Sequence, residues 1–224
     1  MKNVPKTAEL FDFTKTIAAE LFADSEYPWD ILDDIGDFIK KLGPTLDTER
    51  FELRGDNVWV ARDANVAPSA YINGPCIIDE GAEIRHCAYI RGKAIIGKGS
   101  IVGNSCEVKN AVIFDSVQVP HFNYVGDSVL GYKSHMGAGS VTSNVKSDKT
   151  LVCVRSEDES VDTERKKMGA MLGDFVEVGC NSVLCPGTIV GRNSTVYPLS
   201  LVRGVVPENS IVKGGRGVFS KISQ

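Results

Sequence analysis

The chain has 224 residues and a formal net charge of −4 at pH 7, with a sequence pI of about 5.5. This charge gives no electrostatic support for a nucleic-acid partner, because phosphate backbones bind basic surfaces. Apolar runs long enough to span a membrane are missing, and the first residues, MKNVPKTAEL, lack the apolar core of a signal peptide, so we predict a soluble, cytoplasmic protein without a membrane partner.

Residues 1–50 differ in pattern from the rest of the chain, because their apolar residues recur at helical spacing. Two groups follow this spacing: Leu10, Phe13, Ile17 and Leu21, and then Ile31, Ile35, Phe38, Ile39 and Leu42. Pro28 suits the start of a helix, and Gly43-Pro44 is a stop signal. We predict two helices that form a cap over the start of the repeat domain that follows, with a lid or a partner-binding surface as the alternative.

A six-residue repeat runs from Val60 to Glu107 without interruption. Its first position is always Val or Ile, at Val60, Val66, Ile72, Ile78, Ile84, Ile90, Ile96 and Val102. Its fifth position is always small, at Ala64, Ala70, Cys76, Ala82, Ala88, Ala94, Ser100 and Cys106. A fixed short period of this kind is typical of a solenoid.

A period of six fits neither a helix, with 3.6 residues per turn, nor a strand that alternates every two residues. It fits a short strand followed by a bend, with one aliphatic residue pointing inward and one small residue under the corner. Three such units close a triangular coil of about eighteen residues, and each coil buries its apolar side by stacking on the next. The sequence therefore predicts a mainly β fold: a single-stranded parallel β-helix of hexapeptide repeats with an N-terminal α-helical segment.

The repeat continues beyond Glu107 with two slips, VKNAV and VGDSV, in which the unit is five residues long. Residues 145–171 break the pattern with a charged stretch, SEDESVDTERKK, and a loop this long in a compact domain is usually functional or disordered. The repeat then resumes, with inward positions at Leu172, Val178, Leu184, Val190, Val196 and Val202. We predict a β-helix over residues 51–212 with an extruded loop over 145–171, followed by a C-terminal tail over 213–224.

Six cysteines are present, and no two of them form a CxxC pair. Cys76 and Cys106 occupy the small inward position of their units. We predict that these two are buried thiols and that the cysteines form no disulfide or zinc framework.

Arg91 and Lys109 hold the same position in units three apart, so they are expected to stack on neighbouring coils about 4.8 Å apart. Two cations at that separation repel each other unless an anion lies between them. Glu107 is one such anion and a bound phosphate is another, while two solvated surface cations are the alternative.

His121 is the third residue of VPHFNY, a position that points outward from its face. One coil further on, the same position is Ala138, which leaves open space beside the imidazole for a ligand. An imidazole near neutral pH can accept a proton from an attacking amine or hydroxyl. The alternative is a solvated histidine without a role.

His86 has the same position two coils earlier, roughly 10 Å away by the strand spacing. His135 lies at a corner, in a different position of its unit. A histidine-ligated zinc needs about three protein ligands near 2 Å, and no two of these histidines are that close within one chain. The sequence predicts no metal site within the chain, and a site between chains stays open.

The stretch PHFNYVGDSVLGYKSHMGAGSVTSN, preceded by VKNAVIF, resembles the acetyltransferase domain of the bifunctional bacterial N-acetylglucosamine-1-phosphate uridyltransferase/glucosamine-1-phosphate acetyltransferase. The shared elements are HxxYxGD, then xGAGxxTxN, and a lysine twelve residues before the histidine. The resemblance covers about residues 75–212 and leaves no room for that enzyme's nucleotidyltransferase domain. It implies a left-handed β-helix and a homotrimer with sites between neighbouring chains.

The same resemblance implies roles for single residues. His121 matches the catalytic base, which deprotonates the sugar amine for attack on the acetyl thioester. Arg91 and Lys109 match the basic pair that holds the sugar phosphate, and Tyr124 and Asn144 match positions that contact the sugar.

Other matches concern the acetyl-CoA site and further contacts with the sugar substrate. Ala138 and Cys180 match positions that line the acetyl-CoA site, where Cys180 replaces a serine. Lys167 matches a further substrate lysine, with Lys149 as its rival. His135 stands where the family has an asparagine that touches the sugar, which puts the identity of the sugar in doubt.

The resemblance implies an acetyl-CoA-dependent N-acetyltransferase that acts on an amino-sugar phosphate, similar to glucosamine 1-phosphate, or on a related sugar nucleotide. A non-catalytic sugar-phosphate and CoA-binding or regulatory protein is the first alternative. A γ-class carbonic anhydrase, which shares the solenoid, is a weaker one, because the histidines here are spaced too far apart in sequence for its pattern.

Overall fold

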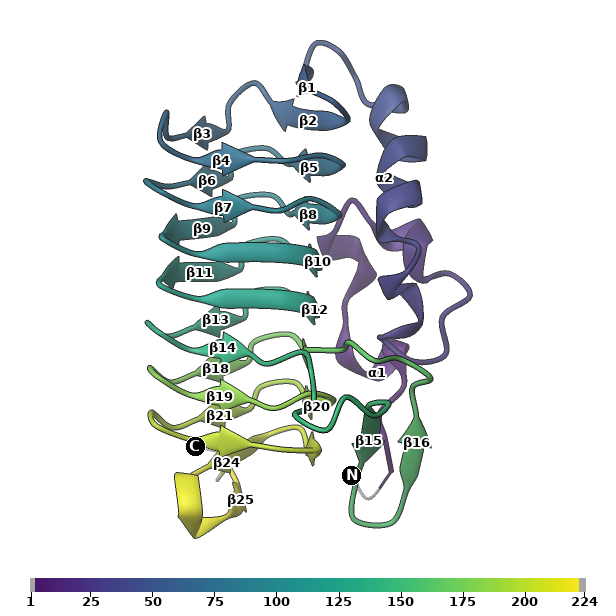
Figure 1. Cartoon of the computed structure of the whole chain (residues 1–224), viewed down its shortest axis with the longest axis vertical. Coiled ribbons are helices and arrows are strands. Elements are labelled where there is room, and N and C mark those ends of the chain that lie inside the picture. Colours follow the sequence, from purple (N-terminus) through teal and green to yellow (C-terminus); the bar gives the residue numbers. More distant parts are fainter. Residues whose placement is uncertain (1–2, 222–224) are drawn as a thin grey trace.

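A computed structural model describes residues 3–221 as a long three-sided prism with an N-terminal segment along one side (Figure 1). Each coil gives one short strand to each face, and strands stack in parallel. Val66 lies opposite Ile84, which in turn lies opposite Val102, so the same repeat position faces itself in successive coils. The predicted fold class, a single-stranded parallel β-helix with an N-terminal helical segment, is confirmed.

Three stacks of strands form the faces of the prism. The first face consists of β2 (Val58–Ala61), β5 (Cys76–Ile78), β8 (Ala94–Ile96), the ends of β10 (Glu107–Ile113) and β12 (Tyr124–Leu130), β17 (Ala170–Leu172), β20 (Thr188–Val190) and β23 (Val205–Val206). The second consists of β3 (Asn65–Val66), β6 (Glu83–Ile84), β9 (Ile101–Asn104), β11 (Gln118–His121), β13 (His135–Met136), β18 (Glu177–Val178), β21 (Thr195–Val196) and β24 (Ser210–Val212). The third consists of β4 (Tyr71–Ile72), β7 (Tyr89–Ile90), the starts of β10 and β12, β14 (Val141–Thr142), β19 (Val183–Leu184) and β22 (Leu201–Val202).

Two strands run through a corner instead of ending at it. β10 pairs with β7 at its start and with β8 at its end, and β12 follows the same course one coil further on. These are the two five-residue units, so the missing residue joins the third face to the first. Asn110 and Asp127 make this turn with left-handed backbone angles, φ +48° and +49°, which Asn and Asp tolerate better than most residues. We call this edge the Asp127 corner.

The inside of the prism is filled by the predicted aliphatic positions. From Ile78 to Val102 and from Leu172 to Val202 every one of them is buried, and only Val66 and Ile72, near the open end, are partly exposed. Cys76 and Cys106 are buried as predicted, and all six cysteines are free thiols. Because both sides of a coil touch another coil, the repeat satisfies its backbone hydrogen bonds and buries its apolar side at the same time.

The N-terminal segment, residues 3–46, corrects two predictions. It holds α1 (Thr7–Leu10), α2 (Ile35–Leu42) and the 3₁₀ turns η1 (Phe13–Lys15), η2 (Ala19–Phe22), η3 (Asp30–Leu32) and η4 (Gly43–Thr45). The helix predicted over Leu10–Leu21 is therefore only one turn of α-helix followed by separate 3₁₀ turns. The second helix starts at Ile35, later than Pro28 suggested, and ends as predicted before Gly43.

The segment also does not cap the first coils. It runs along the first face, where α2 contacts β5, β8 and β10 (Figure 1). The reason lies in the residues that point outward from this face, which are apolar and fully covered: Ile77, Ile95, Val112, Val129, Met171 and Ile189. An uncovered stripe of this kind would expose several hundred Å² of apolar surface, so the segment packs there.

Aromatic contacts and one buried carboxylate fix the segment to the prism. The ring of Phe114 lies 5.1 Å from that of Phe11 and 5.7 Å from that of Phe22, measured between centroids. The carboxylate of Asp174 accepts hydrogen bonds from the backbone of Asp12 and of Tyr132, both at 2.8 Å. Burial raises the pKa of Asp174 above its ordinary value.

The loop predicted over 145–171 is an ordered hairpin segment, with β15 (Cys153–Arg155) antiparallel to β16 (Ser160–Asp162). Its residues Val152 and Val154 are buried. It binds the N-terminal segment through Arg165, which pairs with Asp33 at 2.6 Å. The prism resumes at Ala170, two residues earlier than predicted.

At each end of the prism, one antiparallel strand pairs with the last strand of one face. β1 (Phe51–Gly55) pairs with β2, and β25 (Val218–Ser220), within the predicted tail, follows the 3₁₀ turn η5 (Gly214–Arg216) and pairs with β24. Unpaired strand edges otherwise invite pairing with other chains. No helix within residues 3–221 is both long and apolar enough to cross a bilayer.

Candidate functional site

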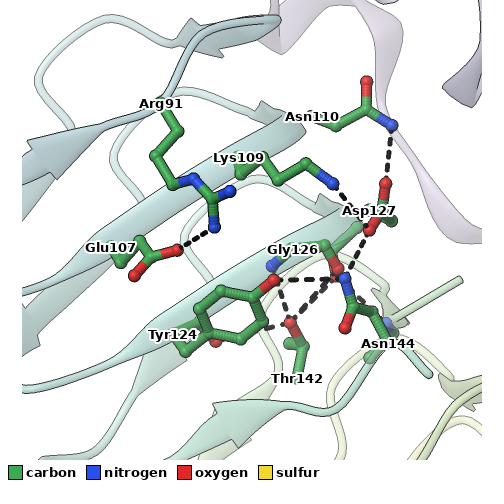
Figure 2. A network of polar contacts seen from close by, with 11 residues as sticks. Arg91, Glu107, Lys109, Asn110, Tyr124, Gly126, Asp127, Thr142 and Asn144 are labelled. Carbon is green, nitrogen blue, oxygen red and sulfur yellow. Dashed lines mark hydrogen bonds and ion pairs between the residues drawn. The ribbon is translucent and has the colours of Figure 1, made fainter. Parts of the chain in front are cut away.

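A buried carboxylate organises the polar residues at the Asp127 corner (Figure 2). Asp127 accepts a hydrogen bond from the Asn110 side chain at 2.9 Å and from the Asn144 side chain at 2.5 Å, and its carboxylate lies 3.6 Å from the Lys109 ammonium. Its side chain is only 6 % exposed. The Asp127 carboxylate thus has one cation and two hydrogen-bond donors around it, and these contacts fix the positions of Lys109 and Asn144.

Tyr124 reaches this corner across the third face. Its hydroxyl accepts a hydrogen bond from Asn144 at 3.1 Å, and its ring lies over Gly126, where a Cβ atom would meet the hydroxyl oxygen at 2.4 Å. Gly126 therefore has to be a glycine for the tyrosine to cross its own strand. Burial raises the pKa of Tyr124, and the nearby Asp127 carboxylate acts in the same direction.

Arg91 and Lys109 do start from neighbouring coils, as predicted, because the Arg91 amide bonds to the carbonyl of Val108. Their side chains then diverge (Figure 2). Arg91 pairs with Glu107 at 2.6 Å, whereas Lys109 turns toward Asp127. The two cations also line different cavities, so they do not form one binding surface.

His121 lies exposed at the end of β11, at the edge between the second and third faces, which we call the His121 corner. Phe122 and Asn123 separate it from Tyr124 at the start of β12. The buried Asn123 fixes the turn: its amide oxygen accepts the His121 backbone N–H at 3.0 Å, and its amide nitrogen donates to the carbonyls of Gly137 and Ser140. The histidine and the polar network therefore flank the two edges of one face.

The predicted cofactor residues stack on His121. Gln118 lies opposite His135, which places His121 beside Ala138, and the Gly139 amide bonds to the His121 carbonyl at 3.0 Å. One coil further, the Asn181 amide bonds to the Ala138 carbonyl at 2.9 Å, which places Cys180 next in line. Since coils lie about 4.8 Å apart, the three residues form a column along the His121 corner. Ala138 is partly exposed, and Cys180 is exposed.

The other histidines are held elsewhere. His86 occupies the predicted place two coils before His121 and bonds to the Ser69 hydroxyl at 2.6 Å. His135 begins β13, at the far end of the second face from His121, and pairs with Glu177 at 2.9 Å. It therefore lies on a strand and not at a corner, and within one chain it does not approach Tyr124 or Asn144. Residues 3–221 contain no group of three or more potential ligands arranged to hold a metal ion.

A cavity of about 410 Å³ opens beside the Asp127 corner, and we call it the basic pocket. Lys109 and Lys167 both line it, whereas Lys149 does not. Lys167 is brought there by its neighbours, because the Met168 and Gly169 amides bond to the carbonyls of Asn144 and Asp127. The geometry favours Lys167 over its rival.

Two residues of this site were missed from the sequence, Asp127 and Asn123. Asp127 lies in the HxxYxGD motif and within the second five-residue unit, so an unusual turn at that point was already visible. Asn123 occupies the fifth position of its unit, which is otherwise small. A polar amide in an inward position needs hydrogen-bond partners, and that requirement was the available signal.

These features define the class of protein: a hexapeptide-repeat β-helix that carries polar residues on the outer wall of its central coils. The family model of the GMPPB C-terminal domain matches residues 72–213, and the chain belongs to this family. The match covers the prism from Ile72 onward and the hairpin segment, and it leaves out the N-terminal segment and strands β1 to β3.

Curated relatives extend the similarity. The chain is 32 % identical over 201 residues to "Bifunctional protein GlmU" of Methanococcus maripaludis, a match that covers 88 % of this chain and 49 % of the relative. It is 34 % identical over 121 residues to "Bifunctional sugar-1-phosphate nucleotidylyltransferase/acetyltransferase" of Sulfurisphaera tokodaii, covering 54 % of this chain and 28 % of the relative. The chain spans at most about half the length of these relatives.

Among solved structures, PerB from Caulobacter crescentus in complex with CoA and GDP-perosamine is 18 % identical, with a TM-score of 0.33, and covers 79 % of this chain and 62 % of that chain. The acetyltransferase domain of PglB from Neisseria gonorrhoeae in complex with acetyl coenzyme A is 15 % identical, with a TM-score of 0.28, covering 73 % and 57 %.

Proposed function

We propose that this chain is an acetyl-CoA-dependent N-acetyltransferase that acts on an amino-sugar phosphate similar to glucosamine 1-phosphate, or on a related sugar nucleotide. The observation that carries the proposal is the column of His121, Ala138 and Cys180, one prism face away from the Tyr124–Asn144–Asp127 network. The column offers a base beside two positions that match the acetyl-CoA site of the acetyltransferase domain that the sequence resembles. The network offers hydrogen bonds and a lysine for a phosphorylated sugar.

In the proposed reaction His121 acts on the amino group of the sugar. As the nitrogen attacks the thioester carbonyl, an N–C bond forms, and the imidazole accepts the proton that the nitrogen loses. The carbonyl then reforms, the C–S bond breaks, and the CoA thiolate leaves and takes the proton. Asn144, Tyr124, Lys109 and Lys167 hold the sugar phosphate, and Arg91, which turns away from Lys109 toward Glu107, lies at the edge of the site.

We also propose a homotrimer with its sites between neighbouring chains, as the family resemblance implies. A flat prism face offers no enclosed pocket, and the His121 corner needs a second wall to hold a thioester. His135 would then reach the sugar from a neighbouring subunit, since it lies far from Tyr124 within its own chain. Light scattering of the purified chain tests the assembly directly.

The deciding experiment is a screen of amino-sugar phosphates and their nucleotide derivatives with acetyl-CoA, following the release of free thiol and the mass of the product. We expect release of CoA with an equal amount of N-acetylated sugar. If no amino sugar is acetylated by the wild-type chain at any concentration, the proposal fails.

Thiol labelling tests the cofactor column without turnover. Cys180 and Cys87 are exposed, whereas burial raises the pKa of Cys76 to about 12 and keeps that thiol unreactive. We expect saturating acetyl-CoA to slow alkylation of Cys180 at least fivefold, as judged by mass spectrometry of labelled peptides, because the ligand covers it. Cys87, on a coil before His121, is the matched control; equal protection of both thiols, or of neither, contradicts the assignment.

A non-catalytic binding or regulatory protein is the second candidate. It is favoured by His135, which contacts Glu177 and stands where the acetyltransferase that the sequence resembles has a sugar-contacting asparagine. Calorimetry separates the two functions: binding of sugar phosphate and acetyl-CoA without product supports the second candidate.

A further inference from the structure

Three parts of the chain meet at the basic pocket. The N-terminal segment supplies its first side, the Asp127 corner its floor, and the hairpin segment its third side. The lining residues are Leu32 and Asp33, then Lys93, Lys109, Asn110 and Asp127, and finally Glu164, Arg165, Lys166 and Lys167. The side formed by Leu32 and Asp33 lies outside the stretch that the family model matches.

Five cations and three carboxylates line this cavity, and the cations are unevenly paired. Arg165 is neutralised by Asp33 at 2.6 Å, and Lys109 lies 3.6 Å from Asp127. The ammonium groups of Lys93, Lys166 and Lys167 form no ion pair in the described part of the chain, residues 3–221. Three like charges around one cavity repel one another, and an anion between them removes that repulsion.

The floor of the pocket holds a buried acceptor without a donor. Asn110 is 9 % exposed, and its side-chain oxygen has no hydrogen-bond partner. The amide cannot be turned around, because its nitrogen faces the Asp127 carboxylate, which only accepts hydrogen bonds (Figure 2). A buried acceptor without a donor is unfavourable, so the site suits a ligand that donates a hydroxyl.

A second buried atom calls for the opposite kind of partner. The Nε atom of Arg165 is buried and unpaired, although its two terminal nitrogens are engaged by Asp33 and by the carbonyl of Asp30. It can donate to an oxygen of an anion. The pocket therefore offers donors in excess and one acceptor, which is the pattern of a group that carries both a phosphate and a hydroxyl.

The N-terminal segment also places one of the lysines. The stem of Lys93 lies across Gly36 in α2, where an added Cβ atom would come within 3.2 Å of it. Glycine is a poorer helix former than alanine, and the space that Gly36 leaves accommodates the stem of Lys93. It lets α2 pack against the stem of Lys93, a residue that lines the pocket.

We infer that the basic pocket binds the phosphate group of a phosphorylated sugar, with Lys93 and Lys166 as contacts in addition to Lys109 and Lys167. The sugar identity rests on the proposed function; the phosphate and hydroxyl chemistry rests on the pocket. The N-terminal and hairpin segments thereby become parts of the binding site. Arg91, which lines a different cavity, then lies outside the phosphate contacts.

The test compares Lys93→Ala and Lys166→Ala with Lys149→Ala, an exposed lysine outside the pocket, as the matched control. Calorimetry measures the binding of glucosamine 1-phosphate, glucosamine and inorganic phosphate to the full chain. Each pocket variant is expected to weaken glucosamine 1-phosphate and phosphate about tenfold, since one charge-assisted hydrogen bond is lost, and to leave glucosamine unchanged. The control keeps wild-type affinity for all three.

Several results would overturn the inference: affinities within twofold of wild type in both variants, an equal loss for glucosamine, which lacks the phosphate, or no binding of either phosphate ligand by the wild type. Its failure differs from that of the proposed function. Weakened phosphate binding without any acetylated product leaves the pocket assignment intact and removes the enzyme. Product formation with an unchanged KM in both variants leaves the proposed enzyme intact and removes the pocket assignment.

Discussion

Replacing His121 with alanine is expected to lower the rate of acetyl transfer by about a thousandfold, because a positioned general base contributes between ~10² and ~10⁴ in rate. The imidazole is exposed and has no hydrogen-bond partner among residues 3–221, so nothing in the fold depends on it. We therefore expect the melting temperature of the His121→Ala variant to lie within about 2 °C of wild type, as for other surface substitutions. Steady-state kinetics with free-thiol detection and a thermal melt measure the two effects.

His86→Ala is the matched control for this substitution. His86 lies in the same column two coils earlier and is also exposed, yet it bonds to Ser69 and lies away from Ala138 and Cys180. It should retain wild-type activity. An active His121→Ala variant would exclude the histidine as the base and would shift attention to a binding role for the chain.

Asp127→Asn is expected to lower the free energy of unfolding by about 3 kcal/mol, since it removes a buried carboxylate that accepts two hydrogen bonds and lies beside the Lys109 ammonium. The new amide would set an N–H group against the donors of Asn110, Asn144 or Lys109. Asparagine suits the left-handed turn as well as aspartate does, so the backbone contributes little to the loss. Denaturant unfolding measures the change.

Glu107→Gln tests whether burial is the cause. Glu107 also pairs with a cation, Arg91, but 34 % of its side chain is exposed. An exposed pair contributes about 0–1 kcal/mol, so this variant should be nearly as stable as wild type. Equal destabilisation by both substitutions would contradict a special role for the Asp127 corner.

The repeat is the part of the fold that local sequence determines. Every coil has the same register, so the inward side chain at Ile78 implies those at Ile84 and Ile96, and counting units also predicts that Ala138 lies beside His121. The five-residue units also gave the position of the turn at Asp127. Short-range periodicity suffices here because each coil contacts only its neighbours.

The N-terminal segment could not be placed in this way. Its apolar spacing resembled two helices, yet burial against the first face, not helix periodicity, decides where Leu10 and Phe22 lie. The sequence does contain a signal for the face that this segment covers. Every third unit ends in an apolar residue, as at Ile77 and Ile95, whereas units on the other faces can end in a charged residue such as Glu83. Only a covering segment explains that stripe.

Sequence alone thus determined the prism, its hexapeptide register and the exposure of His121, because these depend on contacts between neighbouring coils. The tertiary structure alone decided the network around Asp127, the separation of Arg91 from Lys109, and the basic pocket. Those features join Asp33, Lys93 and Lys166, which are far apart in the chain. Their meeting depends on how the N-terminal and hairpin segments pack against one face, and that packing leaves no periodic trace in the sequence.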